Sequence, residues 1–164
     1  MAVTAKYDLL LNVEETALTT GVVGNAQTQL HYIATSGTLT NGTTPVVSQV
    51  WSATRSLTAG SDTLDLTALP RGSYANLDLT GLKVKLLKIA TSSSNSAAIV
   101  FADHATTGYL LFGDASGQVT LAAGAEAFFY FKDNLAAVSS TVKQIAITSG
   151  DTDATYSMII VAGA

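Results

Sequence analysis

The chain has 164 residues, of which 48% are hydrophobic and only 12% are charged. A disordered chain combines low hydrophobicity with high charge, so this composition excludes disorder. The absence of cysteine also excludes disulfides and thiolate metal sites. The formal net charge of −4 argues against nucleic-acid binding, because a surface that neutralises phosphates is basic.

Short segments rich in Thr, Val, Ile and aromatic residues, separated by Gly, Asn, Asp and Ser, predict strands along the chain. The first predicted strand covers residues 7–13, and the second places Leu30, Tyr32 and Ala34 on one face. Asn41-Gly42 then predicts a hairpin turn. The remaining predicted strands cover residues 46–57, 64–67, 83–90, 97–102, 108–113, 119–121, 127–131, 142–148 and 155–162.

Roughly eight to ten short strands with turn signals between them predict one all-β domain over residues 1–164. The predicted fold is an antiparallel β-sandwich, most simply a jelly roll. Residues 128–131 and 158–161 are apolar at consecutive positions. Such strands are buried on both faces, or buried on one face and covered by a partner on the other.

Motifs for catalysis and metal binding are absent from the sequence. The two histidines, His31 and His104, have no second ligand close to them in sequence, which favours structural roles over a metal centre or a general base. Asp151 and Asp153 supply too few oxygen ligands for an EF-hand type of calcium loop, and we expect a solvated turn. We therefore predict no enzyme activity, no cofactor and no bound metal.

Other charged residues also have structural interpretations. The stripe of Lys83, Lys85 and Lys88 indicates an edge strand protected by charge. Asp62 and Asp65 are expected in solvated turns, like Asp151. Glu126 is an acid among apolar neighbours, and glycosidase chemistry would need a second carboxylate opposite it.

The N-terminal segment MAVTAKYDLLLNVEE lacks the basic end, long apolar run and cleavage site of a secretory signal. The sequence contains no run of about 20 apolar residues, which a transmembrane helix requires, so we expect no membrane contact. A surface with few charges and many threonines lacks the usual protection against association. We therefore expect partner proteins to cover much of this surface.

The second half of the chain contains a distinctive order of strand and turn types. From residue 64 it reads LDLTALPRGSYANLDLTGLKVK, then SSSNSAAIVF, YLLFG, VTLAAGA, VKQIAI and finally ATYSMIIVAGA. Over roughly residues 60–164, this order resembles the small β-sandwich decoration or cement proteins of tailed-phage virions. The resemblance implies a non-enzymatic virion protein, assembled in the host cytoplasm, that stabilises a capsid shell through contacts with a major capsid protein and its own copies.

Apolar residues near expected edges are the candidates for assembly contacts. We place an N-terminal assembly arm or donated strand at residues 1–15. We expect copies of this chain to associate with one another as a trimer or a polymer. The candidate interface residues are Tyr7, Leu9, Leu10, Leu11, Met158, Ile159 and Ile160. One alternative is an extracellular filament subunit that donates residues 1–15 to its neighbour. Another is a jelly-roll carbohydrate-binding module, for which Trp51 and six tyrosines supply aromatic rings.

Overall fold

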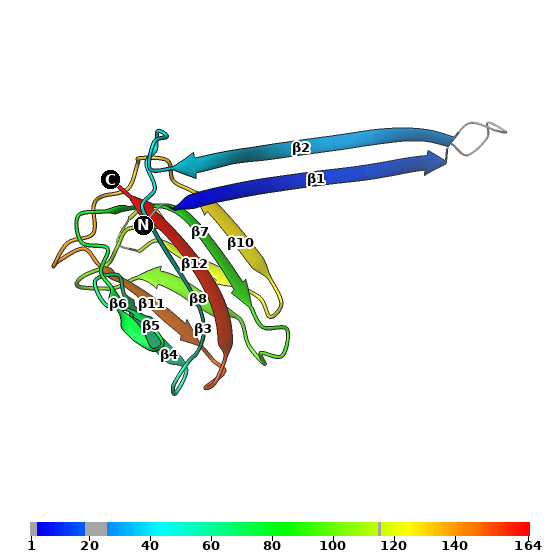
Figure 1. Ribbon diagram of the computed structural model, residues 1–164. Coiled ribbons are helices and arrows are strands. Elements are labelled where there is room, and N and C mark those ends of the chain that lie inside the picture. Colours follow the sequence, from blue (N-terminus) through cyan, green and yellow to red (C-terminus); the bar gives the residue numbers. More distant parts are fainter. Residues whose placement is uncertain (1–2, 19–25, 115) are drawn as a thin grey trace.

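The computed structural model describes residues 3–18, 26–114 and 116–164, which form strands, turns and loops without a helix. The strands are β1 (Thr4–Leu18), β2 (Ala26–Thr40), β3 (Gln49–Ser56), β4 (Ser61–Asp65), β5 (Leu69–Arg71), β6 (Tyr74–Leu77), β7 (Lys83–Thr91), β8 (Ile99–Asp103), β9 (Gln118–Leu121), β10 (Glu126–Tyr130), β11 (Gln144–Ser149) and β12 (Thr155–Gly163). Two four-stranded sheets pack face to face, and β1 and β2 form a long hairpin that leaves the sandwich (Figure 1). The predicted all-β antiparallel sandwich is confirmed.

The eight strands of the sandwich pair in a nested order. One sheet has the order β10-β7-β12-β3, and the other has the order β4-β11-β8-β9. The first strand of the sandwich pairs with the last, β3 with β12, and successive inner pairs are β4 with β11, β7 with β10 and β8 with β9. All of these pairs are antiparallel, so the chain from β3 to β12 follows the path of a long hairpin folded over on itself.

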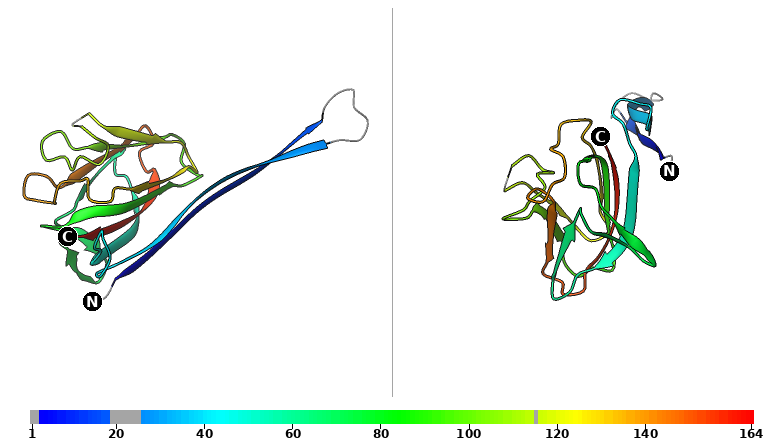
Figure 2. Two further views of the ribbon diagram at one scale, coloured as in Figure 1. Left: turned by 90° about the horizontal axis from the view of Figure 1, so that it is seen from above. Right: turned by 60° about the vertical axis from the view of Figure 1, so that its left-hand side comes forward.

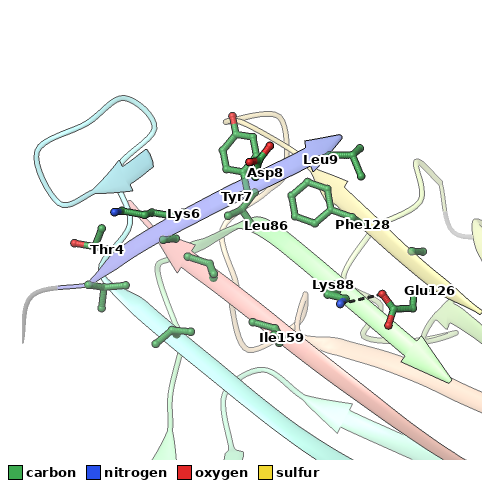
Figure 3. Close-up of a pocket in the computed structure, with 15 residues that line it drawn as sticks. Thr4, Lys6, Tyr7, Asp8, Leu9, Leu86, Lys88, Glu126, Phe128 and Ile159 are labelled. Carbon is green, nitrogen blue, oxygen red and sulfur yellow. Dashed lines mark ion pairs between the residues drawn. The ribbon is translucent and has the colours of Figure 1, made fainter. Parts of the chain in front are cut away.

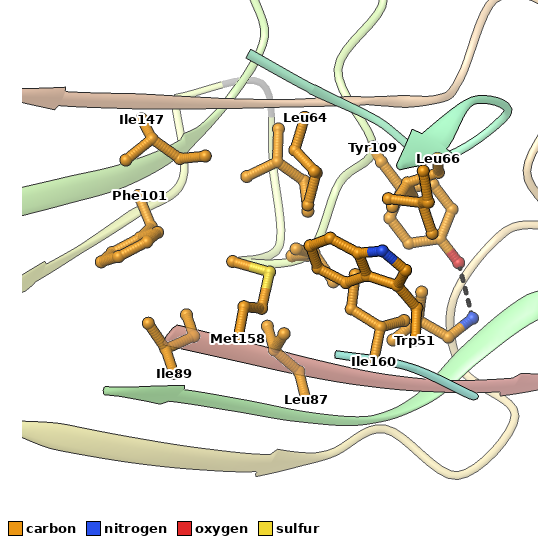
Figure 4. Close-up of a cluster of buried hydrophobic side chains, with 14 of the residues drawn as sticks. Trp51, Leu64, Leu66, Leu87, Ile89, Phe101, Tyr109, Ile147, Met158 and Ile160 are labelled. Atoms are coloured by element: carbon orange, nitrogen blue, oxygen red, sulfur yellow. Dashed lines mark hydrogen bonds between the residues drawn. The ribbon is translucent and has the colours of Figure 1, made fainter. Parts of the chain in front are cut away.

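The main hydrophobic core lies between the two sheets (Figure 4). Trp51 of β3 is buried in it, and its indole N–H donates a hydrogen bond to the carbonyl of Pro70 at 2.8 Å. The buried hydroxyl of Tyr109 accepts from the amide of Val84 at 3.0 Å and donates to the carbonyl of Ala136 at 2.8 Å. Each of these buried polar groups therefore has a partner inside the core, as a stable interior requires.

A charged cluster joins the two sheets. Arg55 of β3 donates two hydrogen bonds to the carboxylate of Asp62 on β4, at 2.7 and 2.8 Å, and the Tyr156 hydroxyl donates to the same carboxylate at 2.7 Å. Burial acts to raise the pKa of Asp62, but these hydrogen bonds lower it below its ordinary value. Asp65 likewise accepts from Lys143 at 2.6 Å. The expectation that Asp62 and Asp65 lie in solvated turns is therefore wrong.

Two local predictions are also wrong, and one small hairpin was not predicted. Residues 108–113 form no strand, because Gly108 makes only an isolated bridge to Gln144. Residues 69–77 form the small β5–β6 hairpin, which the sequence pattern did not predict. The segment at Asn41-Gly42 is a turn, but it does not join a pair of strands, because β3 pairs with β12 instead of β2.

The lysine stripe does not protect an edge. Its strand, β7, lies between β10 and β12 inside the sheet. The Lys85 side chain is fully buried and forms an ion pair with Asp133. Lys88 lies on the outer face of the sheet, where its ammonium is 2.9 Å from the carboxylate of Glu126 on β10. Charge pairing within the fold therefore explains Lys85 and Lys88, and it also explains Glu126.

Candidate assembly surface

The hairpin of β1 and β2 forms a two-stranded arm, defined here as residues 4–18 and 26–40. Its strands pair over fifteen residue pairs, from Thr4↔Thr40 to Leu18↔Ala26. The arm projects away from the sandwich in Figure 1 and in the left-hand view of Figure 2, which is turned by 90° from it. An isolated two-stranded hairpin is marginally stable in water at best. Most of the segment expected as an N-terminal arm, residues 1–15, thus lies in β1 and is paired with a second strand, β2.

A second apolar cluster fixes the root of the arm to the sandwich. It lies on the outer face of the β10-β7-β12-β3 sheet, opposite the main core. Its buried members are Val3, Leu39, Val47, Leu86 and Val161, with Ala5, Tyr7 and Phe128 packed against them. The amide of Val47 also donates to the carbonyl of Thr40 at 3.0 Å, which ties the end of β2 to the segment before β3. The root is therefore anchored by both apolar packing and main-chain pairing.

Tyr7 is the largest side chain of the root. Its ring stacks on Phe128 with centroids 5.9 Å apart, and the Tyr130 ring centroid is 5.4 Å away. Gly37 pairs with Tyr7 in register, and a Cβ at Gly37 would lie 2.6 Å from the Tyr7 hydroxyl oxygen. Glycine therefore leaves room for the ring. This packing explains the apolar run at residues 128–131, because Phe129 packs against the main core while the chain's own arm covers Phe128.

A groove of about 640 Å³ lies beside the root, between β1 and the outer face of the sheet (Figure 3). Its floor includes Val50 and Ile159, whose side chains are 39% and 42% exposed, and the Lys88–Glu126 ion pair. All residues from 3 to 9 line its wall. Because successive residues of a strand point to opposite faces, a wall made of consecutive residues is the edge of β1. No strand of the described residues pairs with this edge.

Three of the predicted interface residues are accessible on this surface. Leu9 and Leu10 are 51% and 59% exposed on the arm, and Ile159 lies in the groove floor. Tyr7 is half-buried in the root. Leu11 pairs with Ile33 in register, but its side chain lies outside the part of the chain that the structure describes.

Met158 and Ile160 require a correction. Both side chains are 1% exposed and belong to the main core, and their strand, β12, is interior to its sheet. The alternation of β12 explains the outcome, because Met158 and Ile160 share the inner face whereas Ile159 points outward. Neither buried side chain is available to a partner.

Sequence reasoning did not identify Val50, Lys88 or Phe128 as parts of this surface. The alternation within residues 46–57 does place Val50 on the opposite face from Trp51. However, nothing in the sequence indicates that β3, β7, β10 and β12 are neighbours. That arrangement comes from long-range strand pairing, which brings together residues more than 100 positions apart.

The other candidate sites have structural roles in the described residues. Asp151 accepts from the amide of Ser96 at 2.7 Å and from the amide of Asp153 at 3.3 Å, so its carboxylate organises two turns. The Nδ1 atom of His104 lies 3.3 Å from the Thr106 hydroxyl oxygen, and the His31 side chain lies outside the described residues. No group of three or more potential metal ligands gathers in residues 3–18, 26–114 and 116–164.

No family model, curated protein or solved structure matches the chain. Within the part of the chain that the structure describes, no helix has the length and hydrophobicity to cross a membrane. The role of the arm and the groove is therefore inferred from their geometry and chemistry.

Proposed function

We propose that the chain is a non-enzymatic structural protein of a virion, which is assembled in the host cytoplasm and stabilises a capsid shell through contacts with the lattice and with its own copies. The sandwich is the rigid body, and the arm and the groove are the contact surface. The observation that carries this proposal is the arm itself. It extends fifteen residue pairs from the sandwich and carries exposed leucines that the chain's own sandwich does not cover.

The cost of exposing these leucines supports an assembly role. Exposed apolar area is unfavourable in water by about 25 cal/mol per Å². A hairpin with few tertiary contacts gains little to offset that cost, because most of its stability must come from packing. A partner that covers the arm would remove this cost, and this accounts for an arm that is long and carries exposed leucines. Many weak contacts of this kind add by avidity on a lattice.

We also propose that the sandwich is a jelly roll. The nested pairing of β3 with β12, β4 with β11, β7 with β10 and β8 with β9 supports this topology, because a jelly roll is an eight-stranded double sheet with two Greek keys. Viral capsid proteins and lectins both use this fold, so the fold alone does not choose between them. Trp51 is buried and cannot stack on a sugar, which removes the main aromatic candidate of a carbohydrate site.

A filament subunit remains the alternative assembly. Donation of residues 1–15 as a single strand would break the pairs between β1 and β2 along most of the arm. The hairpin as a unit is therefore favoured as the connecting element. Filaments would then arise if the contact between the arm and the next copy repeats without closing into a ring.

The proposal is tested by the mass of the purified full chain in solution, measured by light scattering over a range of concentrations. The arm variant replaces Leu9 and Leu10 with aspartate. The matched control is Leu110→Asp, because Leu110 is 44% exposed on the segment between β8 and β9. We expect the wild type and the control to associate and the arm variant to remain monomeric.

Negative-stain images of the same fractions distinguish the products. Closed oligomers support a decoration protein, and long polymers support the filament alternative. A wild-type chain that stays monomeric at every concentration contradicts association through the arm. Binding of a simple sugar by that monomer, measured by titration, would favour the carbohydrate-binding module.

A further inference from the structure

The free edge of β1 is a long surface for main-chain pairing. β1 has fifteen residues, its other edge is occupied by β2, and no described strand covers the free edge. Long exposed edges pair with other strands unless charges, prolines or bulges block them. β1 contains no proline, and its register with β2 is unbroken. Neither a proline nor a bulge blocks this edge, so its four charged residues decide which strand it can accept.

The charges of β1 indicate which strand it accepts. Its only cation, Lys6, lies near the root with one acid, Asp8, and two further acids, Glu14 and Glu15, lie toward the far end. An antiparallel copy of the same strand reverses this order. It can therefore bring Glu14 of one copy opposite Lys6 of the other, at two symmetric places, while Asp8 faces the uncharged Asn12.

We propose that β1 pairs antiparallel with β1 of a second copy around a two-fold axis at Leu10. In this register Leu10 faces Leu10 of the second copy, Lys6 faces Glu14, and Leu9 faces Leu11. The product is a four-stranded antiparallel ribbon with the order β2-β1-β1-β2. The inference rests on the proposed function, since it names the partner of the arm.

Two other registers are less favourable. An axis at Leu11 would place Asp8 opposite Glu14, and like charges directly opposite one another destabilise a strand pair. An axis at Tyr7 would pair Lys6 with Asp8, but the two roots would then lie over the same short stretch of the ribbon. Because Val3 and Tyr7 pack on the sandwich, the two sandwiches would collide. The axis at Leu10 avoids both conflicts.

The groove receives the added strand. When the axis lies at Leu10, residues 11–17 of the second copy run along the wall formed by residues 3–9. They pass over the floor that contains Val50 and Ile159, whose apolar side chains are half-exposed in the single chain. The same contact forms twice, as a two-fold interface requires. One arrangement thus covers both the free edge and the groove floor.

A single cysteine tests the axis directly, because the chain has none of its own. In the proposed dimer the two copies of Leu10→Cys face each other, at a Cα separation of about 4.5 to 5.5 Å that a disulfide can span. The matched control is Thr4→Cys, also exposed on β1. Its two copies would be twelve strand positions apart, or about 40 Å. We expect mild oxidation to link Leu10→Cys into a covalent dimer and to leave Thr4→Cys unlinked.

A mixed pair then tests the register. A Thr4→Cys chain mixed with a Thr16→Cys chain should form the heterodimer disulfide, because these positions face each other. Absence of the Leu10→Cys dimer, or equal linkage of Leu10→Cys and Thr4→Cys, overturns the proposed axis.

A charge exchange provides a second test. Lys6→Glu places like charges opposite Glu14 at both symmetric positions, so we expect the dissociation constant of the dimer to rise by about tenfold. Glu14→Lys should do the same, and the double variant should restore wild-type association. Asp153→Lys is the matched control for Glu14→Lys, because it makes the same change in net charge at an exposed turn outside the arm. Failure of the double variant to restore association overturns the ion pairing.

The two proposals fail in different ways. If Leu9 and Leu10 are required for association but the cysteine and charge tests are negative, the arm makes assembly contacts in another geometry and this inference falls alone. If the wild-type chain does not associate at all, both fall.

Discussion

Two adjacent isoleucines of β12 give a test of the sandwich and of its outer face. Ile159 is 42% exposed in the groove floor, whereas Ile160 is 1% exposed in the main core. Replacing each with alanine removes the same three carbon atoms from the same strand. The loss of β propensity is therefore shared, and the difference between the variants reports burial.

The expected magnitudes follow from the two environments. At about 0.8 kcal/mol for each buried methylene-sized group, full burial of three carbons contributes about 2.4 kcal/mol, and the cavity left in the core adds to that cost. We expect Ile160→Ala to lower the free energy of unfolding by about 3 to 4 kcal/mol. At Ile159 the surroundings are already partly solvent, so the cost should be about 1 kcal/mol.

Thermal unfolding followed by circular dichroism measures this difference, and urea unfolding provides the free energies. A gap of about 2 kcal/mol corresponds to a difference in Tm of about 4 to 8 °C for a domain of this size. Light scattering should show the opposite ranking for self-association, since only Ile159 lies in the groove. Equal destabilisation of the two variants, or a larger effect at Ile159, would refute the assigned faces of β12.

Three further predictions concern acid stability, the Tyr7 ring and the root of the arm. Burial acts to raise the pKa of Asp65, but hydrogen bonds from Lys143 and Thr67 lower it to about 2, from 3.8. Its stabilisation is complete above the unfolded pKa and is lost as the pH falls from about 4 to about 2. Asp65→Asn should flatten this part of the unfolding profile by about 1 kcal/mol, and an unchanged slope would show that the ion pair contributes nothing. Gly37→Val should displace the Tyr7 ring, change the near-ultraviolet circular dichroism and cost about 0.5 to 1.5 kcal/mol in lost stacking, whereas Gly42→Ala should have no such effect. Val47→Asp puts an unpaired charge into the root, so amide exchange in β1 and β2 should accelerate more than exchange in the sandwich; uniform acceleration would show that the arm is not a separate unit.

The sequence pattern predicts the sandwich strands well because their alternation is strong. Leu64 and Leu66 are alternate residues of the strand predicted at 64–67, and both are buried in the core. The segments at 83–90 and 155–162 match β7 and β12 within about a residue at each end. The sequence pattern wrongly predicts a strand at 108–113, because Tyr109 and Leu111 are buried without a ladder of strand pairs. Burial of apolar side chains in a loop produces the same pattern as a short strand.

The assembly surface is less accessible to sequence reasoning. Leu9, Leu10 and Ile159 were predicted from hydrophobicity near expected edges, and the structure places all three at the surface. The same reasoning selected Met158 and Ile160, because an apolar run on consecutive positions does not show which face is covered. β10 illustrates this limit of sequence reasoning. A partner is predicted to cover one face of its apolar run, whereas in the structure Tyr7 of the same chain covers Phe128. Only the three-dimensional course of the arm reveals this contact.

The most direct test of the assembly account is the solution mass of the full chain beside that of the Leu9→Asp, Leu10→Asp variant, measured by light scattering at rising concentration. The account predicts that the wild-type mass rises above that of one chain while the variant stays at 16.9 kDa with an unchanged fold. A variant that associates as strongly as the wild type would contradict the assignment of the arm as the assembly element.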